Sequence, residues 1–149
     1  MRAVVQRVNF ASVTVDGKKV SQIKKGLLVF VGFSFDDKQS DLEYIFKKVI
    51  NLRIFEDEIG KMNLSLLDKN FEVLVVSQFT LYGDCRKGNR PNFMNSLSSD
   101  KAVIMYEQFL KLFTDFGINI KSGIFQADMK VQLENDGPVT IQLDSNKMY

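Results

Sequence analysis

The chain has 149 residues and a mass of 17.1 kDa; 45% of its residues are hydrophobic, 26% are charged, and its formal net charge is +2. These values are typical of one globular domain with a substantial core and argue against disorder. The absence of histidine excludes a Ser-His-Asp triad, a Cys-His dyad and an imidazole-ligated metal. Because Cys85 is the single cysteine, disulfide frameworks and multi-thiolate sites are excluded too, and we expect neither a metal nor a cofactor.

The N-terminal segment "MRAVVQRVNF" lacks the long apolar run of a signal peptide, and no apolar run approaches the roughly 20 residues of a spanning helix. We therefore expect a soluble cytoplasmic domain with no membrane partner. The mildly basic charge permits a polyanionic partner without requiring one.

The first half of the chain predicts a hairpin, a buried strand and a helix. Val13 and Val15 alternate with Thr14 before an Asp-Gly turn at residues 16–17. The apolar run at residues 26–33 is short enough for a buried strand. Residues 40–52 then show helical spacing, with Ser40 and Glu43 at capping-box positions. The expected buried face of this helix comprises Leu42, Ile45, Phe46, Val49 and Ile50.

The second half predicts further strands and one more helix. A short strand and a polar loop precede "FEVLVVSQFTL" at residues 71–81, which reads as a strand with a polar end. A helix is expected at about residues 100–116, with Gly117 as its stop signal. After a strand pattern from Ile118, residues 129–133 and 139–143 predict a final hairpin. Residues 1–149 thus predict a single α+β domain with two main helices and a mostly antiparallel, barrel-like sheet.

The polar end "SQFTL" is the first candidate site. Strand alternation would place Gln78 and Thr80 on one side and Ser77 and Phe79 on the other. Polar groups at the end of a buried strand either satisfy loop backbone or line a pocket, and the sequence leaves both open. Because the chain has no histidine, and no lysine lies in or near "SQFTL" before Lys87, neither hydroxyl has a visible base. We therefore expect side chains that position an activated ester and backbone amides that stabilise an oxyanion.

Two loop motifs add to this candidate site. "CRKGNRPNF" places Arg86, Lys87 and Arg90 directly after the polar strand end, where they either contact phosphates or form a solvated loop. In "NDGPVT" at residues 135–140, a proline follows an Asp-Gly hairpin signal and removes a backbone donor. An edge strand tolerates such a proline, so that explanation stays open beside a functional one.

Together, "SQFTL" and "NDGPVT" closely resemble the two signature motifs of the D-aminoacyl-tRNA deacylases, which clear D-amino acids from mischarged tRNA. The similarity extends over nearly the whole chain through "MRAVVQRV", "ASVTVDG", "GLLVFVG", "RIFEDEIGKMN", "RPNF" and "ADMKVQL". The loop "YGDCRKGN" shows the least resemblance. The family resemblance implies hydrolysis of D-aminoacyl-tRNA and of glycyl-tRNA mischarged on tRNA(Ala), with no DNA partner.

The resemblance also implies a homodimer in which a cis Gly-Pro bond enters the active site of the other subunit and excludes L-aminoacyl groups. Catalysis would then rely on positioning and on the 2′-hydroxyl of the RNA. The implied catalytic residues are Ser77, Gln78 and Thr80. The implied substrate-binding residues are Phe79, Gly137, Pro138, Val139, Arg7, Met129 and Phe125.

Two other functions remain open from the residues alone. One is a general esterase with Thr80 as a covalent nucleophile, which lacks an identified base. The other is a small RNA-binding module in which Phe79 and Phe93 stack bases beside basic loops. The low net charge and the lack of an aromatic-rich RNA-binding strand argue against the second.

Overall fold

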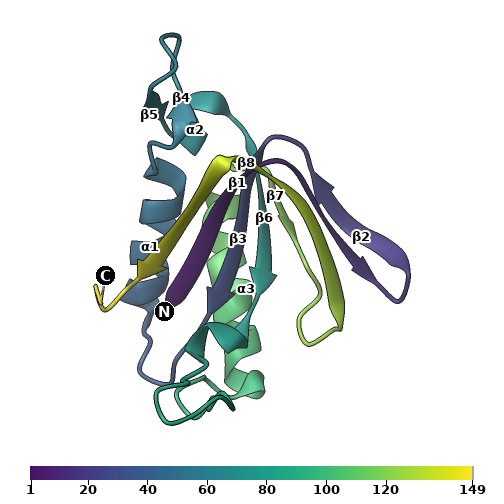
Figure 1. The fold of residues 1–149 in the computed structure, drawn as a ribbon, viewed down its shortest axis with the longest axis vertical. Coiled ribbons are helices and arrows are strands. Elements are labelled where there is room, and N and C mark those ends of the chain that lie inside the picture. The colour runs from purple at the N-terminus through teal and green to yellow at the C-terminus, as the bar shows by residue number, and fades with distance from the viewer. Residues whose placement is uncertain (149) are drawn as a thin grey trace.

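A bent, mixed sheet of six strands dominates the computed structural model, which describes residues 1–148 (Figure 1). The long strand β1 pairs antiparallel with β8 along one edge and with β3 and then β2 along the other. The β3–β6 and β6–β7 pairs are parallel. The expected mostly antiparallel, barrel-like sheet is confirmed, with these two parallel pairs added.

The elements follow in the order β1 (Arg2–Val15), β2 (Lys18–Ile23), β3 (Gly26–Gly32), α1 (Gln39–Asn51), β4 (Phe55–Glu56), β5 (Met62–Leu64), α2 (Leu66–Lys69), β6 (Glu72–Ser77), the 3-10 helix η1 (Phe79–Tyr82), α3 (Ser99–Asp115), β7 (Ile120–Ser122) and β8 (Met129–Asp144). The early hairpin is confirmed, because β1 and β2 meet at Asp16 and Gly17, which both have positive φ. The apolar run at residues 26–33 forms β3, whose parallel pairing with β6 buries both strands in the sheet centre.

Helix α1 begins at Gln39, so the capping box expected at Ser40 and Glu43 is wrong. The N-cap is Lys38, whose N–H donates to Asp41 Oδ2 at 2.8 Å. A carboxylate at the third helical position is a strong acceptor for that otherwise unpaired N–H. The predicted apolar face is confirmed: Leu42, Ile45, Phe46, Val49 and Ile50 are all buried.

Helix α3 covers the back of the sheet in Figure 1 and lies within one residue of its predicted bounds. Tyr106, Phe109 and Phe113 are buried, and Gly117, with φ 81°, ends the helix as expected. Phe116 is 57% exposed because it follows the last helical turn. No helix among residues 1–148 is long and apolar enough to cross a membrane.

The final hairpin expected around "NDGPVT" is wrong, because β8 is a single strand from Met129 to Asp144. Both halves pair with β1, which is long enough to partner each of them. Gln6 lies opposite Thr140 and Val8 opposite Asn135, so residues 136–139 face Arg7 alone and form a bulge. We call residues 136–139 the gate segment.

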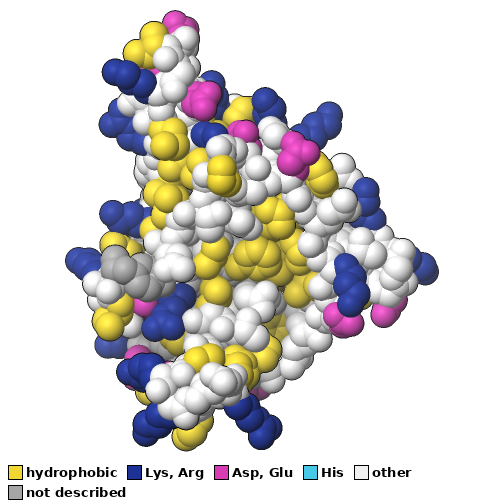
Figure 2. Space-filling model, in the orientation of Figure 1, with side chains coloured by type: hydrophobic (Ala, Val, Ile, Leu, Met, Phe, Trp, Pro, Cys, Tyr) yellow, Lys and Arg dark blue, Asp and Glu magenta, His cyan; other side chains and the backbone are white. Residues whose placement is uncertain are grey.

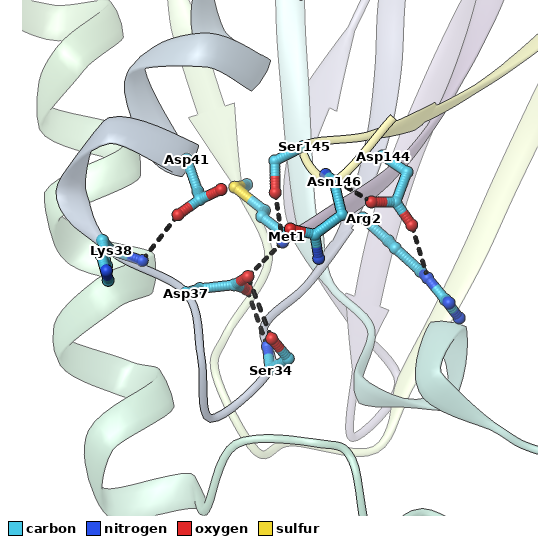
Figure 3. Close-up of polar contacts among 9 residues, drawn as sticks. All are labelled: Met1, Arg2, Ser34, Asp37, Lys38, Asp41, Asp144, Ser145 and Asn146. Carbon is cyan, nitrogen blue, oxygen red and sulfur yellow. Dashed lines mark hydrogen bonds and ion pairs between the residues drawn. The ribbon is translucent and has the colours of Figure 1, made fainter. Parts of the chain in front are cut away.

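Polar contacts hold the ends of β1 and β8 against the β3–α1 loop (Figure 3). The Met1 ammonium pairs with Asp37 and donates to Ser145 Oγ at 2.7 Å. Arg2 Nε donates to Asp144 Oδ2 at 3.0 Å. Buried charges need such partners, so this network fixes the end of the sheet that carries the site described next.

Candidate functional site

The strand predicted to reach residue 81 ends at Ser77, and the chain turns into η1. Gln78 N–H makes the last contact along the sheet, donating to Val31 O at 2.7 Å, and Gly83 N–H then donates to Thr80 O at 2.9 Å. Strand alternation therefore does not apply beyond Ser77, and the predicted division of the polar residues between two faces is wrong.

Gln78 and Thr80 nevertheless lie together, because the Gln78 side-chain amide donates to Thr80 Oγ1 across the turn. An amide N–H group cannot accept a proton, so this partner orients the threonine hydroxyl without activating it. The Thr80 hydrogen stays free to donate to a ligand. The arrangement is suited to positioning and lacks the base that a nucleophilic threonine needs.

A cavity of about 620 Å³ opens beside the end of β6. We call it the first cavity. Five of the residues implied as site residues line it: Ser77, Gln78, Phe79, Phe125 and Met129. Thr80 is not among its lining residues but follows Phe79 in η1. The cavity is in the size range of small-molecule sites and has the mixed apolar and polar lining that such sites share.

Aromatic rings build the walls of the first cavity. Phe79 is 57% exposed and meets Phe93 edge-on, with ring centroids 5.1 Å apart. Phe125 packs on Tyr106 at 5.7 Å, and the Tyr106 hydroxyl donates to Val75 O at 2.8 Å. Burial raises the pKa of Tyr106, so this hydroxyl stays a donor. No sequence signal points to the support that Tyr106 gives to Phe125.

The gate segment contains a cis peptide bond between Gly137 and Pro138. Gly137 has φ 118°, a conformation that L residues rarely adopt, and a Cβ there would lie 2.8 Å from Arg7 Nη2. Gly137 and Pro138 are exposed, whereas Val139 is half-buried against the core. Because β8 lies at an edge of the sheet, the edge-strand explanation for the proline also agrees with the fold.

Arg7 is 5% exposed and contacts the gate segment through its side chain. Its Nε donates to Asp136 O at 3.2 Å and pairs with the Asp136 carboxylate at 3.1 Å, while Nη1 donates to Ile54 O at 2.6 Å. Asn135 Nδ2 bridges Arg7 O at 3.2 Å and Val139 O at 2.9 Å. These bonds hold both ends of the bulge in place.

The gate segment and the first cavity lie at opposite ends of β3. Arg7 pairs with Leu27 near the start of β3, whereas Val31 and Gly32 near its end line the cavity. Four residues of strand correspond to about 13 Å. Within one chain, therefore, neither Gly137 nor Pro138 lines the cavity.

The basic loop after η1 is partly neutralised. Arg86 makes a fork of bonds to Asp84, the shortest 2.7 Å from Nη2 to Oδ2, and these bonds hold the pKa of Asp84 well below its usual range. Lys87 and Arg90 are exposed. Among residues 1–148, no three His, Cys, Asp or Glu side chains are grouped so that they could hold a metal ion.

Comparison with known proteins agrees with these features. A family model described as D-Tyr-tRNA(Tyr) deacylase matches residues 4–144. The chain is 58% identical to the D-aminoacyl-tRNA deacylase of Clostridioides difficile (strain 630) and 57% identical to that of Thermosipho melanesiensis, with both chains fully covered in each case. The chain belongs to the D-aminoacyl-tRNA deacylase family.

The chain also superposes on two solved structures. The protein named c-Myc DNA Unwinding Element Binding Protein is 46% identical and superposes with a TM-score of 0.92 over 97% of this chain and 98% of that chain. A probable eukaryotic D-amino acid tRNA deacylase, 19% identical, superposes with a TM-score of 0.82 over 95% and 97% of the two chains. At that identity, the second likeness shows the fold alone.

Proposed function

We propose that this protein hydrolyses the ester bond of D-aminoacyl-tRNA and releases free D-amino acid and tRNA. The observation that carries the proposal is the first cavity, where Ser77, Gln78 and Phe79 meet in a chain that belongs to the deacylase family. A volume of about 620 Å³ suits the terminal adenosine with its amino acid. The reaction is a cytoplasmic proofreading step in translation.

The chemistry relies on positioning. An aminoacyl ester is already activated, and the terminal ribose supplies a 2′-hydroxyl beside the reacting carbonyl. Thr80 and Gln78 orient the substrate, and the first backbone N–H groups of η1, which have no intrahelical partners, stabilise the oxyanion. Water attacks the carbonyl carbon, the ester C–O bond breaks, and the ribose oxygen takes the proton. Holding these groups in place supplies the rate enhancement.

Stereochemical selection comes from the gate segment of a second subunit. In one chain, Gly137 and Pro138 are exposed and lie away from the first cavity, so a partner has to supply them to it. Their backbone then occupies the space that an L side chain would need, whereas a D side chain points elsewhere. Glycine has no side chain to collide, so glycyl-tRNA, including glycine mischarged on tRNA(Ala), is also hydrolysed.

The sheet face turned away from α3 offers a surface for this second copy. Figure 2 shows apolar side chains gathered at the middle of that face. Among the half-buried side chains of the sheet, Phe30, Val131 and Leu133 pack against a second core cluster, separate from the one that contains α1 and α3. Burying such a patch in a symmetric interface is a common reason for a two-fold dimer.

A binding module and a covalent esterase make different predictions for one experiment. D-aminoacyl-tRNA is incubated with the protein, and free amino acid and intact tRNA are measured by thin-layer chromatography. The proposal predicts catalytic turnover with no acyl-enzyme in rapid-quench samples. A protein that protects the ester is a binding module, and a trapped acyl-Thr80 supports the esterase.

A further inference from the structure

A second cavity, of about 760 Å³, adjoins the first. The two cavities are lined by neighbouring residues of the chain, because Gly32 and Phe79 line the first, whereas Ser34 and Tyr82 line the second. The second cavity is lined by Arg2, Ser34, Phe35, Asp36, Tyr82, Gly83, Asp84, Cys85, Arg86, Asn95, Asn146 and Met148.

A buried hydroxyl without a partner lies in the wall of the second cavity. Tyr82 is 7% exposed, and among the described residues its hydroxyl makes no hydrogen bond. The neighbouring Ser34 hydroxyl donates to Asp37 Oδ1 at 3.0 Å, so it has no hydrogen left for Tyr82, and its nearness lowers the Tyr82 pKa by less than burial raises it. Burial raises the pKa of Tyr82, so the hydroxyl keeps its hydrogen. Buried polar groups are normally paired, and an unpaired one points to a partner from outside the chain.

The other lining groups suit a nucleobase better than a phosphate. Arg2 and Arg86 carry positive charge, but each is paired, with Asp144 and Asp84 respectively. Phe35 is 61% exposed and offers an aromatic face. A base needs such a face together with hydrogen-bonding groups, whereas a phosphate needs unpaired positive charge.

Unpaired positive charge is found next to the second cavity instead. Lys87 and Arg90 follow its lining residue Arg86 in the loop after η1, and both are exposed. Lys and Arg side chains flank this loop at the bottom of Figure 2. The loop motif that the sequence left open thus places exposed positive charge beside the second cavity, where it could contact a phosphate.

We propose that the second cavity binds the unpaired nucleotide immediately upstream of the terminal adenosine, with its base on Phe35 and within hydrogen-bonding reach of Tyr82. This inference rests on the proposed function, which places the adenosine in the first cavity. It assigns to this chain a two-nucleotide footprint on the RNA 3′ end, recognised by stacking and one buried hydroxyl.

The test is equilibrium binding of adenosine and of the trinucleotide cytidine-cytidine-adenosine, which requires no turnover. The wild-type protein is expected to bind the trinucleotide about fivefold or more tightly than adenosine, the gain from stacking one of the two added bases on Phe35. Phe35→Ala should abolish most of that difference and leave adenosine binding unchanged. Phe116→Ala, at a similarly exposed phenylalanine (57%) on the far end of α3, is the matched control and should change neither affinity.

Tyr82→Phe is a second variant, for which we expect the stability and the trinucleotide affinity to change in opposite directions. It removes the unpaired buried hydroxyl, so it should raise the melting temperature while weakening trinucleotide binding. General damage to the fold would lower both the melting temperature and the trinucleotide affinity. Equal wild-type affinities for adenosine and trinucleotide, or equal losses for both ligands in Phe35→Ala, would overturn the inference. Loss of D-aminoacyl-tRNA hydrolysis with the binding pattern intact would instead contradict the proposed function.

Discussion

The two mechanisms, positioning and covalent catalysis, predict different effects of substituting Thr80. Its hydroxyl accepts from the Gln78 amide, and no basic group contacts it in the described chain. Thr80→Ala should therefore lower the rate of D-aminoacyl-tRNA hydrolysis by about tenfold, the value of one hydrogen bond, and Thr80→Ser should retain most of it. Single-turnover kinetics measures both. Loss of a covalent nucleophile costs several orders of magnitude, so a collapse to the uncatalysed rate with binding intact would favour that mechanism.

At position 137, both the backbone conformation and the neighbouring Arg7 side chain oppose any residue larger than glycine. Alanine there must adopt φ 118° and place Cβ 2.8 Å from the buried Arg7 guanidinium. We expect Gly137→Ala to lower the free energy of unfolding by about 3 kcal/mol or more, from backbone strain and disturbed Arg7 hydrogen bonds. Urea denaturation measures this change.

Gly60→Ala is the matched control for that variant. Gly60 has φ 75°, and no atom lies within 4 Å of its ideal Cβ position. Only the left-handed backbone then opposes alanine, at a cost of about 1–2 kcal/mol. Equal losses for the two variants would show that the contact with Arg7 does not constrain the gate segment.

At the scale of elements, the N-cap of α1 makes a prediction about acid stability. Burial raises the pKa of Asp41, but the Ser145 hydroxyl, the Lys38 N–H and the N-terminal ammonium together lower it below its usual value of 3.8. A depressed folded-state pKa means that the carboxylate stabilises the fold above the unfolded-state pKa and that this contribution is lost as the pH falls through the folded-state pKa.

Asp41→Asn should therefore lower the free energy of unfolding at pH 7 by about 0.5–1 kcal/mol and by less at pH 3. Thermal denaturation at the two pH values measures the difference. Glu58→Gln, at an exposed residue of the loop between β4 and β5, is the control for a change of net charge. An equal loss for Asp41→Asn at both pH values would show that its charge is not the source of stabilisation.

The elements also show where local sequence patterns are sufficient. The burial of α1 follows from its apolar spacing, and Gly117 marks the end of α3, because both depend on residues close in sequence. The role of "NDGPVT" depends on β1, a strand far away in sequence that is long enough to pair with both halves of β8. The Asp-Gly pair therefore favours a hairpin locally, but because both halves of β8 pair with β1, the segment forms a bulge instead.

Local pattern was also insufficient at the candidate site. Residues 72–77 were correctly predicted as strand, but the turn of η1 at Gln78 depends on its contacts with Val31 and within the turn itself. The second cavity and the unpaired Tyr82 hydroxyl arise from the packing of several distant segments, which no single stretch of sequence specifies. The residue types of the site were predictable, and their relative positions were not.

At the scale of the whole molecule, the separation of the gate segment from the first cavity predicts assembly. Sedimentation should give about twice the chain mass of 17.1 kDa. Dilution below the dimer dissociation constant should abolish hydrolysis, since each cavity then lacks the Gly137 and Pro138 of a second copy. Activity assays over a dilution series, matched by sedimentation, test this. A fully active monomer would contradict the cross-subunit arrangement.

The most direct measurement compares three substrates in parallel: the same tRNA carrying a D-amino acid, its L enantiomer, or glycine. Release of labelled amino acid is followed with and without the protein, at equal substrate concentrations. The proposed function predicts rapid hydrolysis of the D-aminoacyl and glycyl esters, with the L-aminoacyl ester lost only at its spontaneous rate. Hydrolysis of the D and L esters at the same rate, or protection of all three esters, would contradict it.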